Sequence, residues 1–483
     1  MKEKSLKKNF IYNFLYQLLA ILVPLVTSPY LARVLGAENI GISSWTSTIA
    51  FYFGIFVTLG IENYGSREIA YIRQNSDSVV KKFWSIYACQ VINLCVIILI
   101  YSIYILVGIR EYRTIFYILI FAILTKGLDI TWFFNGLEEF KVTVLRNTIV
   151  KIITLICIFV FVRNDGDLWK YVLINTLGTF TGQLMLWINI KKYVPRIYIP
   201  HKNEVFKNYK PLWILFIPVM AISIFTYMDK YMIGILSNVI ENGYYENADK
   251  IISVPKAFIT TIGTVMLPRA SNLIANNKKE EANNYIEISM LYTIIMGSAL
   301  TFGMAGVADL FSVVFWGADF AKSGIMIVGL APAIIFSVVG SVVRSQYLIP
   351  YAKDKEYTLS LIISAFVNFV VNLILIPKFG GMGAVIGTLC SEYILMVIQL
   401  WCVKKELPIY RYLKNGFAFI LFGIIMYIVL RLIKPYMKIS VSSLIILIAI
   451  GGTIYILLCI CYILFSKNSV AVYLKKALNK KHV

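Results

Sequence analysis

The chain of 483 residues is too apolar for a soluble globular protein. Hydrophobic residues make up 59% of it, charged residues only 15%, and the mean hydropathy is +0.76, whereas soluble domains contain about 45–50% apolar residues. In a soluble chain, a formal net charge of +21 would indicate a nucleic-acid partner. Lys and Arg, however, lie mostly in short segments between long apolar runs. We therefore predict a polytopic membrane protein without a nucleic-acid partner.

Cysteine and histidine provide no sign of a metal or catalytic centre. The seven cysteines lie in or beside apolar runs without metal-ligand spacing. The only histidines are His201, in a loop, and His482, in the tail. The chain therefore contains too few histidines for a histidine-based metal site or a catalytic triad. We expect no metal, no cofactor and no enzymatic activity.

Apolar runs of about 20 residues are candidate transmembrane helices. The first, from about Phe10 to Tyr30, follows a basic N-terminus and lacks a small-residue cleavage site, so we expect a retained helix rather than a signal peptide. A second span, at 40–60, is rich in Ser, Thr and Gly, and the charged segment ENYGSREIAYIRQNSDSVVKK is expected to be a loop. The other spans of the first half are expected at 84–107, 115–135, 142–162 and 168–190.

The second half begins after the basic segment KKYVPRIYIPHKNEVFKNYK. Its spans are expected at 211–236, 250–268, 285–308, 325–347, 357–376, 381–403, 412–430 and 441–465. The fold class is therefore an all-α polytopic membrane protein with about fourteen transmembrane helices. We predict an N-lobe at 1–195, a cytoplasmic linker at 196–210, a C-lobe at 211–405, and a peripheral helix pair with a basic tail at 406–483.

The two lobes show an internal repeat. At an offset of 202 residues Gly41, Arg67 and Asn75 match identical residues, and at an offset of 205 the pair Gly178 and Gly182 does so. Parallel repeats are typical of transporters that work by alternating access. Both Gly-x-x-x-Gly pairs are expected to serve close helix packing. If both termini are cytoplasmic, most of the 46 Lys and Arg residues lie in loops on the cytoplasmic side, as the positive-inside rule requires.

Charges inside the apolar spans indicate a transport pathway. The span at 211–236 contains Asp229 and Lys230, and a charge at that depth costs about 2.5–3.5 kcal/mol on insertion scales. The alternative is that these charges neutralise partners on neighbouring helices and only hold the bundle together. Lys126 and Asp129 are three residues apart and are expected on one helix face. Lys151 lies near the middle of its span.

Several motifs occur in order along the chain. They are SPYLARVLG followed by ENIG, YGSREIA, WFFNGLEEFK, MDKYMIG, VMLPRAS, QYLIPYAKDKEYT and IPKFGGMGAVIGT. Together they resemble the polysaccharide-transporter branch of the multidrug/oligosaccharidyl-lipid/polysaccharide exporter superfamily, and more narrowly its Wzx-type repeat-unit flippases. The resemblance extends from the first span through the twelfth.

The resemblance implies a two-lobed flippase in the bacterial cytoplasmic membrane. Such a protein moves undecaprenyl-diphosphate-linked oligosaccharide repeat units for capsule, O-antigen or exopolysaccharide synthesis, by alternating access through a cationic central cavity. The lipid-linked oligosaccharide and the bilayer are the expected partners. Polysaccharide polymerase and chain-length proteins are further candidate partners.

Functional roles can be assigned to the charged residues on this basis. Candidate substrate-binding residues are Arg33, Lys126, Lys151, Lys230 and Lys256. Asp129 and Asp229 are candidate coupling-ion sites or lysine partners, with Lys126 favoured as the partner of Asp129. Candidate cytoplasmic gate residues are Arg67, Arg269 and Arg344, for which snorkelling and salt bridges with nearby acids are an equal alternative. Glu392 has no obvious partner in the sequence.

Four other functions are consistent with parts of this pattern. A teichoic-acid precursor flippase differs only in its substrate. A cation-coupled drug antiporter needs a membrane-embedded carboxylate, which the first span lacks. A non-transporting scaffold for envelope synthesis would tolerate neutralisation of the embedded charges. A membrane polymerase or ligase needs a sizeable outer loop with catalytic residues, and the outer loops expected here are short.

Overall fold

The computed structural model describes residues 6–276 and 278–465, which are almost entirely helical and include no β-strand. Contacts divide the chain into two compact units, Met1–Gly234 and Ile235–Val483. The dividing point lies inside one long helix, α8, rather than in the basic segment before it. The lobe boundaries expected from the internal repeat stay a prediction.

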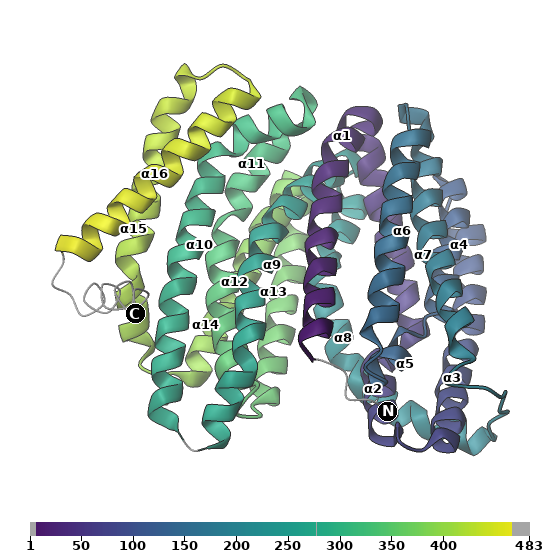
Figure 1. The fold of residues 1–483 in the computed structure, drawn as a ribbon. Coiled ribbons are helices and arrows are strands. Elements are labelled where there is room, and N and C mark those ends of the chain that lie inside the picture. Colours follow the sequence, from purple (N-terminus) through teal and green to yellow (C-terminus); the bar gives the residue numbers. More distant parts are fainter. Residues whose placement is uncertain (1–5, 277, 466–483) are drawn as a thin grey trace. The chain divides into compact units, whose positions relative to one another are not determined.

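The helices follow one another with short connections (Figure 1). Those of the first unit are α1 (Leu6–Thr58), α2 (Ile61–Ile72), α3 (Ser76–Ile103), η1 (Tyr104–Gly108), α4 (Arg113–Gly127), α5 (Thr131–Gly136), α6 (Phe140–Phe161), η2 (Asp165–Asp167), α7 (Leu168–Ile190) and most of α8 (Lys202–Leu236). Those of the second unit are α9 (Val239–Ala275), α10 (Lys279–Trp316), η3 (Ala318–Phe320), α11 (Ala321–Leu330), α12 (Pro332–Val343), η4 (Arg344–Leu348), α13 (Asp354–Phe379), α14 (Gly381–Val403), α15 (Ile409–Ile433), η5 (Lys434–Tyr436) and α16 (Val441–Phe465).

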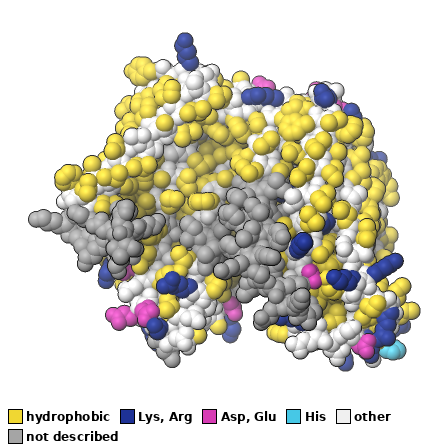
Figure 2. Space-filling view, in the orientation of Figure 1, with side chains coloured by type: hydrophobic (Ala, Val, Ile, Leu, Met, Phe, Trp, Pro, Cys, Tyr) yellow, Lys and Arg dark blue, Asp and Glu magenta, His cyan; other side chains and the backbone are white. Residues whose placement is uncertain are grey.

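The composition of the helices confirms a polytopic membrane protein. Among the described residues, ten helical segments are long and apolar enough to cross a bilayer, or eleven if the bent pair formed by 318–330 and 332–348 is one span. On the visible face of each unit, hydrophobic side chains cover most of the middle, and charged side chains gather mainly near the helix ends (Figure 2). Each of the fourteen expected spans overlaps a helix, but the count of fourteen membrane crossings stays a prediction.

The first two expected spans are joined directly, without a loop. They form the two parts of α1, which is interrupted only at Gly36, where the backbone has φ +73° and ψ 175°. Glycine adopts this left-handed φ without the steric penalty of a Cβ atom. The chain can therefore change direction at a single residue.

The segment expected as a charged loop after the second span contains a helix instead. Residues Ile61–Ile72 form α2, whose buried residues are Ile61, Tyr64, Gly65 and Ile69. This spacing places them on one side of the helix. The abundance of charges suggested a loop, but the helical period of the apolar residues is what determines the structure.

The basic linker is shorter than expected, because α8 begins at Lys202 rather than at Pro211. Its first two turns are held by polar contacts with the first unit. The Asn208 amide donates to the Ser85 hydroxyl at 2.7 Å and accepts a hydrogen bond from the Tyr64 hydroxyl at 2.9 Å. These interactions of a buried asparagine fix the start of the helix and hence the position of the residues that follow along it.

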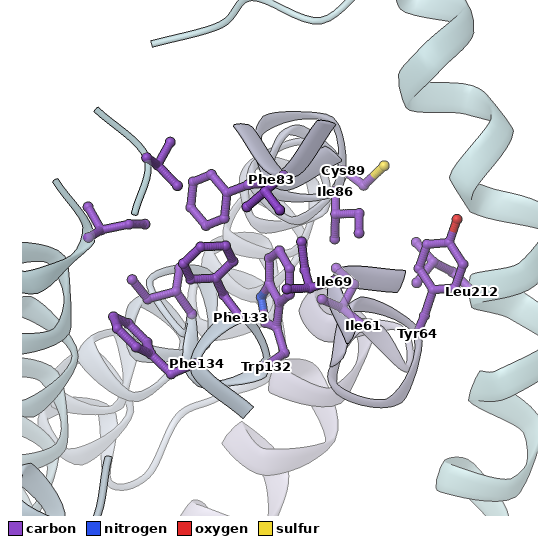
Figure 3. Packing of buried hydrophobic residues seen from close by; sticks show 14 of the residues in the cluster. Ile61, Tyr64, Ile69, Phe83, Ile86, Cys89, Trp132, Phe133, Phe134 and Leu212 are labelled. Atoms are coloured by element: carbon purple, nitrogen blue, oxygen red, sulfur yellow. The ribbon is translucent and has the colours of Figure 1, made fainter. Parts of the chain in front are cut away.

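Aromatic packing forms the core of the first unit beside α2, α3 and α5 (Figure 3). Phe83 is fully buried, and its ring stacks on Trp132 with centroids 5.6 Å apart and meets Phe133 edge-on at 4.9 Å. Such pairs add about 0.5–1.5 kcal/mol beyond the burial of their area. The short helix α5 is therefore firmly anchored, and with it the chain immediately before it.

In the second unit, α15 and α16 pack on α10 and on each other. Arg431, near the end of α15, and Lys434, the first residue of η5, both contact the Asp309 carboxylate on α10. One acid therefore partly balances two cations at this end of α15. The basic tail beyond Phe465 lies outside the described residues.

Candidate functional site

A cavity of about 500 Å³ lies within the first unit. Its walls come from α1, α2, α4, α6 and α7, from the chain between α4 and α5, and from the first residue of α5. The charged residues that line it are Glu62, Lys126, Asp129, Arg146 and Lys151. The volume falls within the range of about 300–1,000 Å³ that is typical of small-molecule sites. Three cations and two carboxylates in one apolar helix bundle make this cavity the candidate functional site.

Lys126 and Asp129 both line the cavity, but they do not lie on one helix as predicted. The expected span at 115–135 is interrupted, since α4 ends at Gly127 and α5 starts at Thr131. The Asp129 side chain accepts a hydrogen bond from the backbone N–H of Thr131, two residues later, at 2.9 Å. An aspartate that satisfies the first N–H groups of a helix in this way competes with continuation of the preceding helix.

The interruption frees backbone carbonyls, and side chains from other helices satisfy them. The Gln90 amide on α3 donates to the carbonyls of Lys126 at 2.6 Å and Asp129 at 2.9 Å, and the Trp187 indole donates to Leu128 at 2.9 Å. Non-helical backbone at membrane depth is tolerated only when protein groups provide such partners. The fully buried Gln90 is therefore a structural determinant of the site that sequence analysis missed.

Within the described part of the chain, Lys126 and Asp129 form no ion pair. The lysine stem instead passes over Gly54 on α1, where a Cβ atom would lie 3.1 Å from Lys126 Cγ. Both charged groups still line the same cavity. The structure thus brings the two residues together at the cavity through the helix interruption rather than through a shared helix face.

Arg146 is a cavity residue that sequence analysis also missed. It lies near the start of α6, is only 9% exposed, and donates from Nη2 to the Thr131 hydroxyl at 3.3 Å. It lies near the start of the span expected at 142–162 but was not singled out there. The available signal was that Arg146, like Lys151, is a charged residue inside a predicted apolar span.

Gly182 on α7 provides the space that Arg146 occupies. A Cβ atom at this position would lie 3.2 Å from Arg146 Cδ and 3.1 Å from a methyl group of Val150. One turn earlier, a Cβ atom at Gly178 would lie 2.5 Å from the Thr154 hydroxyl. The Gly-x-x-x-Gly pair therefore serves close packing of α6 on α7, as expected, and in addition accommodates the arginine.

Asp229 and Lys230 are both buried on α8, but they are not among the described residues that line the cavity. Lys230 Nζ lies 5.8 Å from the centre of the Tyr227 ring, a separation suited to a cation–π contact. Both charged residues also have other interaction partners. Their predicted roles in substrate binding and ion coupling stay predictions.

Lys256 belongs to the second unit and is not among the residues that line the cavity, and its partner is Glu392. Lys256 Nζ on α9 is 2.8 Å from Glu392 Oε1 on α14, with side chains 19% and 6% exposed. Sequence analysis found no partner for Glu392, because the two residues are separated by well over 100 positions. Lys256 therefore differs from Lys126 and Lys151 in being held by a buried carboxylate.

The predicted arginines are dispersed. Arg33 is exposed on the first part of α1 and has an interaction partner of its own. Arg67 is exposed on α2. Arg269 lies over the Tyr285 ring at 5.3 Å, and Arg344 over the Tyr357 ring at 5.8 Å. Within the described residues, none of the three proposed gate arginines forms the expected salt bridge. No cluster of three or more potential metal ligands occurs there either.

The helical fold and the charged cavity define a polytopic membrane protein with a charged cavity in the helix bundle of its first unit. A family model described as "Polysaccharide biosynthesis protein" matches residues 6–274. The chain belongs to this family, which confirms the resemblance found in the sequence.

Individual relatives are similar over most of their length. A Shigella dysenteriae protein named as an O-antigen transporter is 25% identical over 405 residues, which are 83% of this chain and all of the relative. The Staphylococcus aureus capsular polysaccharide biosynthesis protein CapF is 20% identical over 412 residues, which are 82% of this chain and 99% of the relative. The solved structure of the lipid II flippase MurJ in an inward closed conformation shares the fold, with a TM-score of 0.75 at 16% identity over 94% of this chain and 98% of that one.

Proposed function

We propose that this protein is a membrane transporter, not an enzyme, and that it flips lipid-linked oligosaccharide repeat units across the bacterial cytoplasmic membrane. The observation that carries the proposal is the cavity lined by Lys126, Arg146 and Lys151 within an otherwise apolar bundle. Hydroxyl and amide side chains also line the cavity, beside apolar ones. Such a site replaces the water that a diphosphate and a sugar lose on entering hydrocarbon.

The charge balance of the cavity suits a transported anion. Its three cations exceed its two carboxylates by one. The excess positive charge attracts a diphosphate, while the two carboxylates balance part of the positive charge. Arginine offers a planar, bidentate grip on phosphate oxygens, whereas lysine is a compact point charge. One arginine and two lysines together favour binding that is firm enough for entry and weak enough for release.

The names of the relatives support the same class of substrate. One relative is named as an O-antigen transporter and another as a capsular polysaccharide biosynthesis protein, and the similar fold belongs to a lipid II flippase. We infer an undecaprenyl-diphosphate-linked oligosaccharide as substrate. Both termini on the cytoplasmic side and alternating access are the arrangement that the loop charges and the internal repeat favour.

The test is flipping in vesicles. Purified protein is reconstituted with a fluorescent undecaprenyl-diphosphate-linked N-acetylglucosamine, and movement between leaflets is followed by quenching from outside. Lys151→Ala should slow flipping about tenfold or more, because a hydrogen bond to a charged group contributes about 1.5–3 kcal/mol. Lys141→Ala is the matched control, since Lys141 is exposed on the same helix and does not line the cavity.

The outcomes separate the parts of the proposal. Flipping by the wild type and the control, with loss in Lys151→Ala, supports the flippase and its cavity. Equal flipping by all three proteins would place the pathway elsewhere. No flipping and no binding by the wild type would overturn the proposed substrate class.

A further inference from the structure

The α7 wall of the cavity differs chemically from the α4 and α6 walls. It contributes Asn175, Thr176, Thr179, Gly182 and Gln183, which recur at a helical period and share one face. None of these residues is charged, although all three cations of the cavity lie on α4 and α6. The cavity is therefore polarised between a cationic side and a neutral polar side.

The hydroxyl hydrogens of both threonines in the α7 wall, and one amide hydrogen of Asn175, are already engaged. The Thr176 hydroxyl donates to the Val172 carbonyl at 2.8 Å, and the Thr179 hydroxyl donates to the Thr176 carbonyl at 2.9 Å. The Asn175 amide donates to the Tyr171 carbonyl at 2.8 Å. A threonine hydroxyl has only one hydrogen but two lone pairs. Once that hydrogen points into the helix backbone, the group can only accept hydrogen bonds from the cavity.

Gln183 adds a further acceptor to this wall. Its side chain is 6% exposed, and its Oε1 is buried without a hydrogen-bond partner among the described residues. A buried carbonyl oxygen without a hydrogen-bond donor is unfavourable. Rotation of the side chain toward a donor on a substrate in the cavity would give this oxygen its hydrogen bond. The wall thus presents acceptors from three successive turns of α7.

We propose that this acceptor wall, formed by Asn175, Thr179 and Gln183, binds the sugar that is attached to the diphosphate, through the hydroxyl or amide N–H groups of that sugar. Phosphate oxygens are acceptors without hydrogens at neutral pH, so the back-bonded threonine hydroxyls of α7 have no hydrogen to offer them, whereas Lys126, Arg146 and Lys151 attract them. A sugar carries several donors and matches the α7 wall. The inference rests on the proposed function and specifies which wall holds which part of the substrate.

The experiment compares two probes on the reconstituted full-length protein: undecaprenyl diphosphate alone and undecaprenyl-diphosphate-linked N-acetylglucosamine. Thr179→Val removes the hydroxyl acceptor and Gln183→Leu removes the whole side-chain amide, both with little change in side-chain size. Each should weaken binding of the sugar-bearing probe about tenfold and leave binding of undecaprenyl diphosphate unchanged. Arg146→Ala should weaken binding of both probes.

Two controls separate acceptor loss from altered folding. Thr179→Ser keeps the hydroxyl and should restore binding of the sugar-bearing probe. Thr181→Val removes a hydroxyl that is back-bonded in the same way, to the Leu177 carbonyl at 2.8 Å, but does not line the cavity, and should bind both probes as the wild type does.

Equal weakening of both probes in Thr179→Val and Gln183→Leu, or no weakening at all, would overturn the assignment of the sugar to α7 while leaving the flippase proposal intact. Failure of the wild type to bind either probe would instead overturn the proposed function, and the sugar assignment with it.

Discussion

Lys256 on α9 and Glu392 on α14 form a buried ion pair, with 2.8 Å between Nζ and Oε1. Removing one partner leaves an uncompensated buried charge, which costs about 3–5 kcal/mol in comparable cases. We expect Lys256→Ala to lower the unfolding temperature clearly in detergent, measured by tryptophan fluorescence. The double variant Lys256→Met with Glu392→Leu should recover most of the loss, because neither charge then remains buried.

The same double variant tests which role Lys256 has. If the pair only joins α9 to α14, the double variant should flip the fluorescent lipid nearly as fast as the wild type. Recovery of stability without recovery of flipping would instead assign Lys256 to substrate transport.

Gln90 supports the helix interruption that places Lys126 and Asp129 at the cavity. Gln90→Leu leaves the two carbonyls at the interruption without their donor, so we expect Lys126 to shift and the affinity for undecaprenyl diphosphate to fall about tenfold. The matched control is Gln399→Leu, which removes another buried glutamine, bonded to Ser360 at 3.4 Å in the second unit. It should lower stability but not affinity, and equal affinities of the two variants would contradict this role.

Gly182 keeps space for the Arg146 side chain. Gly182→Val places a branched side chain against Arg146 Cδ, and overpacking of this kind usually costs about 1–3 kcal/mol. We expect weaker binding of undecaprenyl diphosphate, measured by native mass spectrometry. Gly178→Val disturbs the same pair of helices at Thr154 but leaves Arg146 in place. If it weakened binding as much as Gly182→Val, the loss would reflect helix packing rather than Arg146.

Asp167, in the loop before α7, provides a pH-dependent test outside the membrane spans. The hydrogen bond from Lys170 at 2.6 Å, with those from the backbone N–H groups of Arg163 and Asn164, lowers the pKa of the Asp167 carboxyl. Because the folded pKa lies below the unfolded value of about 3.9, Asp167 stabilises the fold above that pH and ceases to do so as the pH falls through the folded pKa.

We therefore expect Asp167→Asn to unfold at a lower temperature than the wild type at pH 7. The difference should shrink below about pH 4. Asp165→Asn, in the same loop, is the control and should follow the wild type more closely. A difference for Asp167→Asn that stays constant from pH 7 to pH 3 would contradict an ionic origin.

The sequence by itself determined the class of protein, the family and three of the charged cavity residues, Lys126, Asp129 and Lys151. Hydropathy is a local property, so long apolar runs predicted the membrane helices directly. Lys126 and Lys151 stood out because each interrupts such a run. Order and spacing of short motifs indicated the polysaccharide biosynthesis family, whose model matches residues 6–274.

Only the tertiary structure decided which charges share one site. Arg146 joins Lys126 and Lys151 because α4, α6 and α7 pack together around Gly182, whereas Lys256 is paired with Glu392 in the other unit. The interruption at Asp129 likewise depends on donors from Gln90 and Trp187. The physical reason is that the partner of a buried polar group comes from a distant segment, and local periodicity contains no information about that partner.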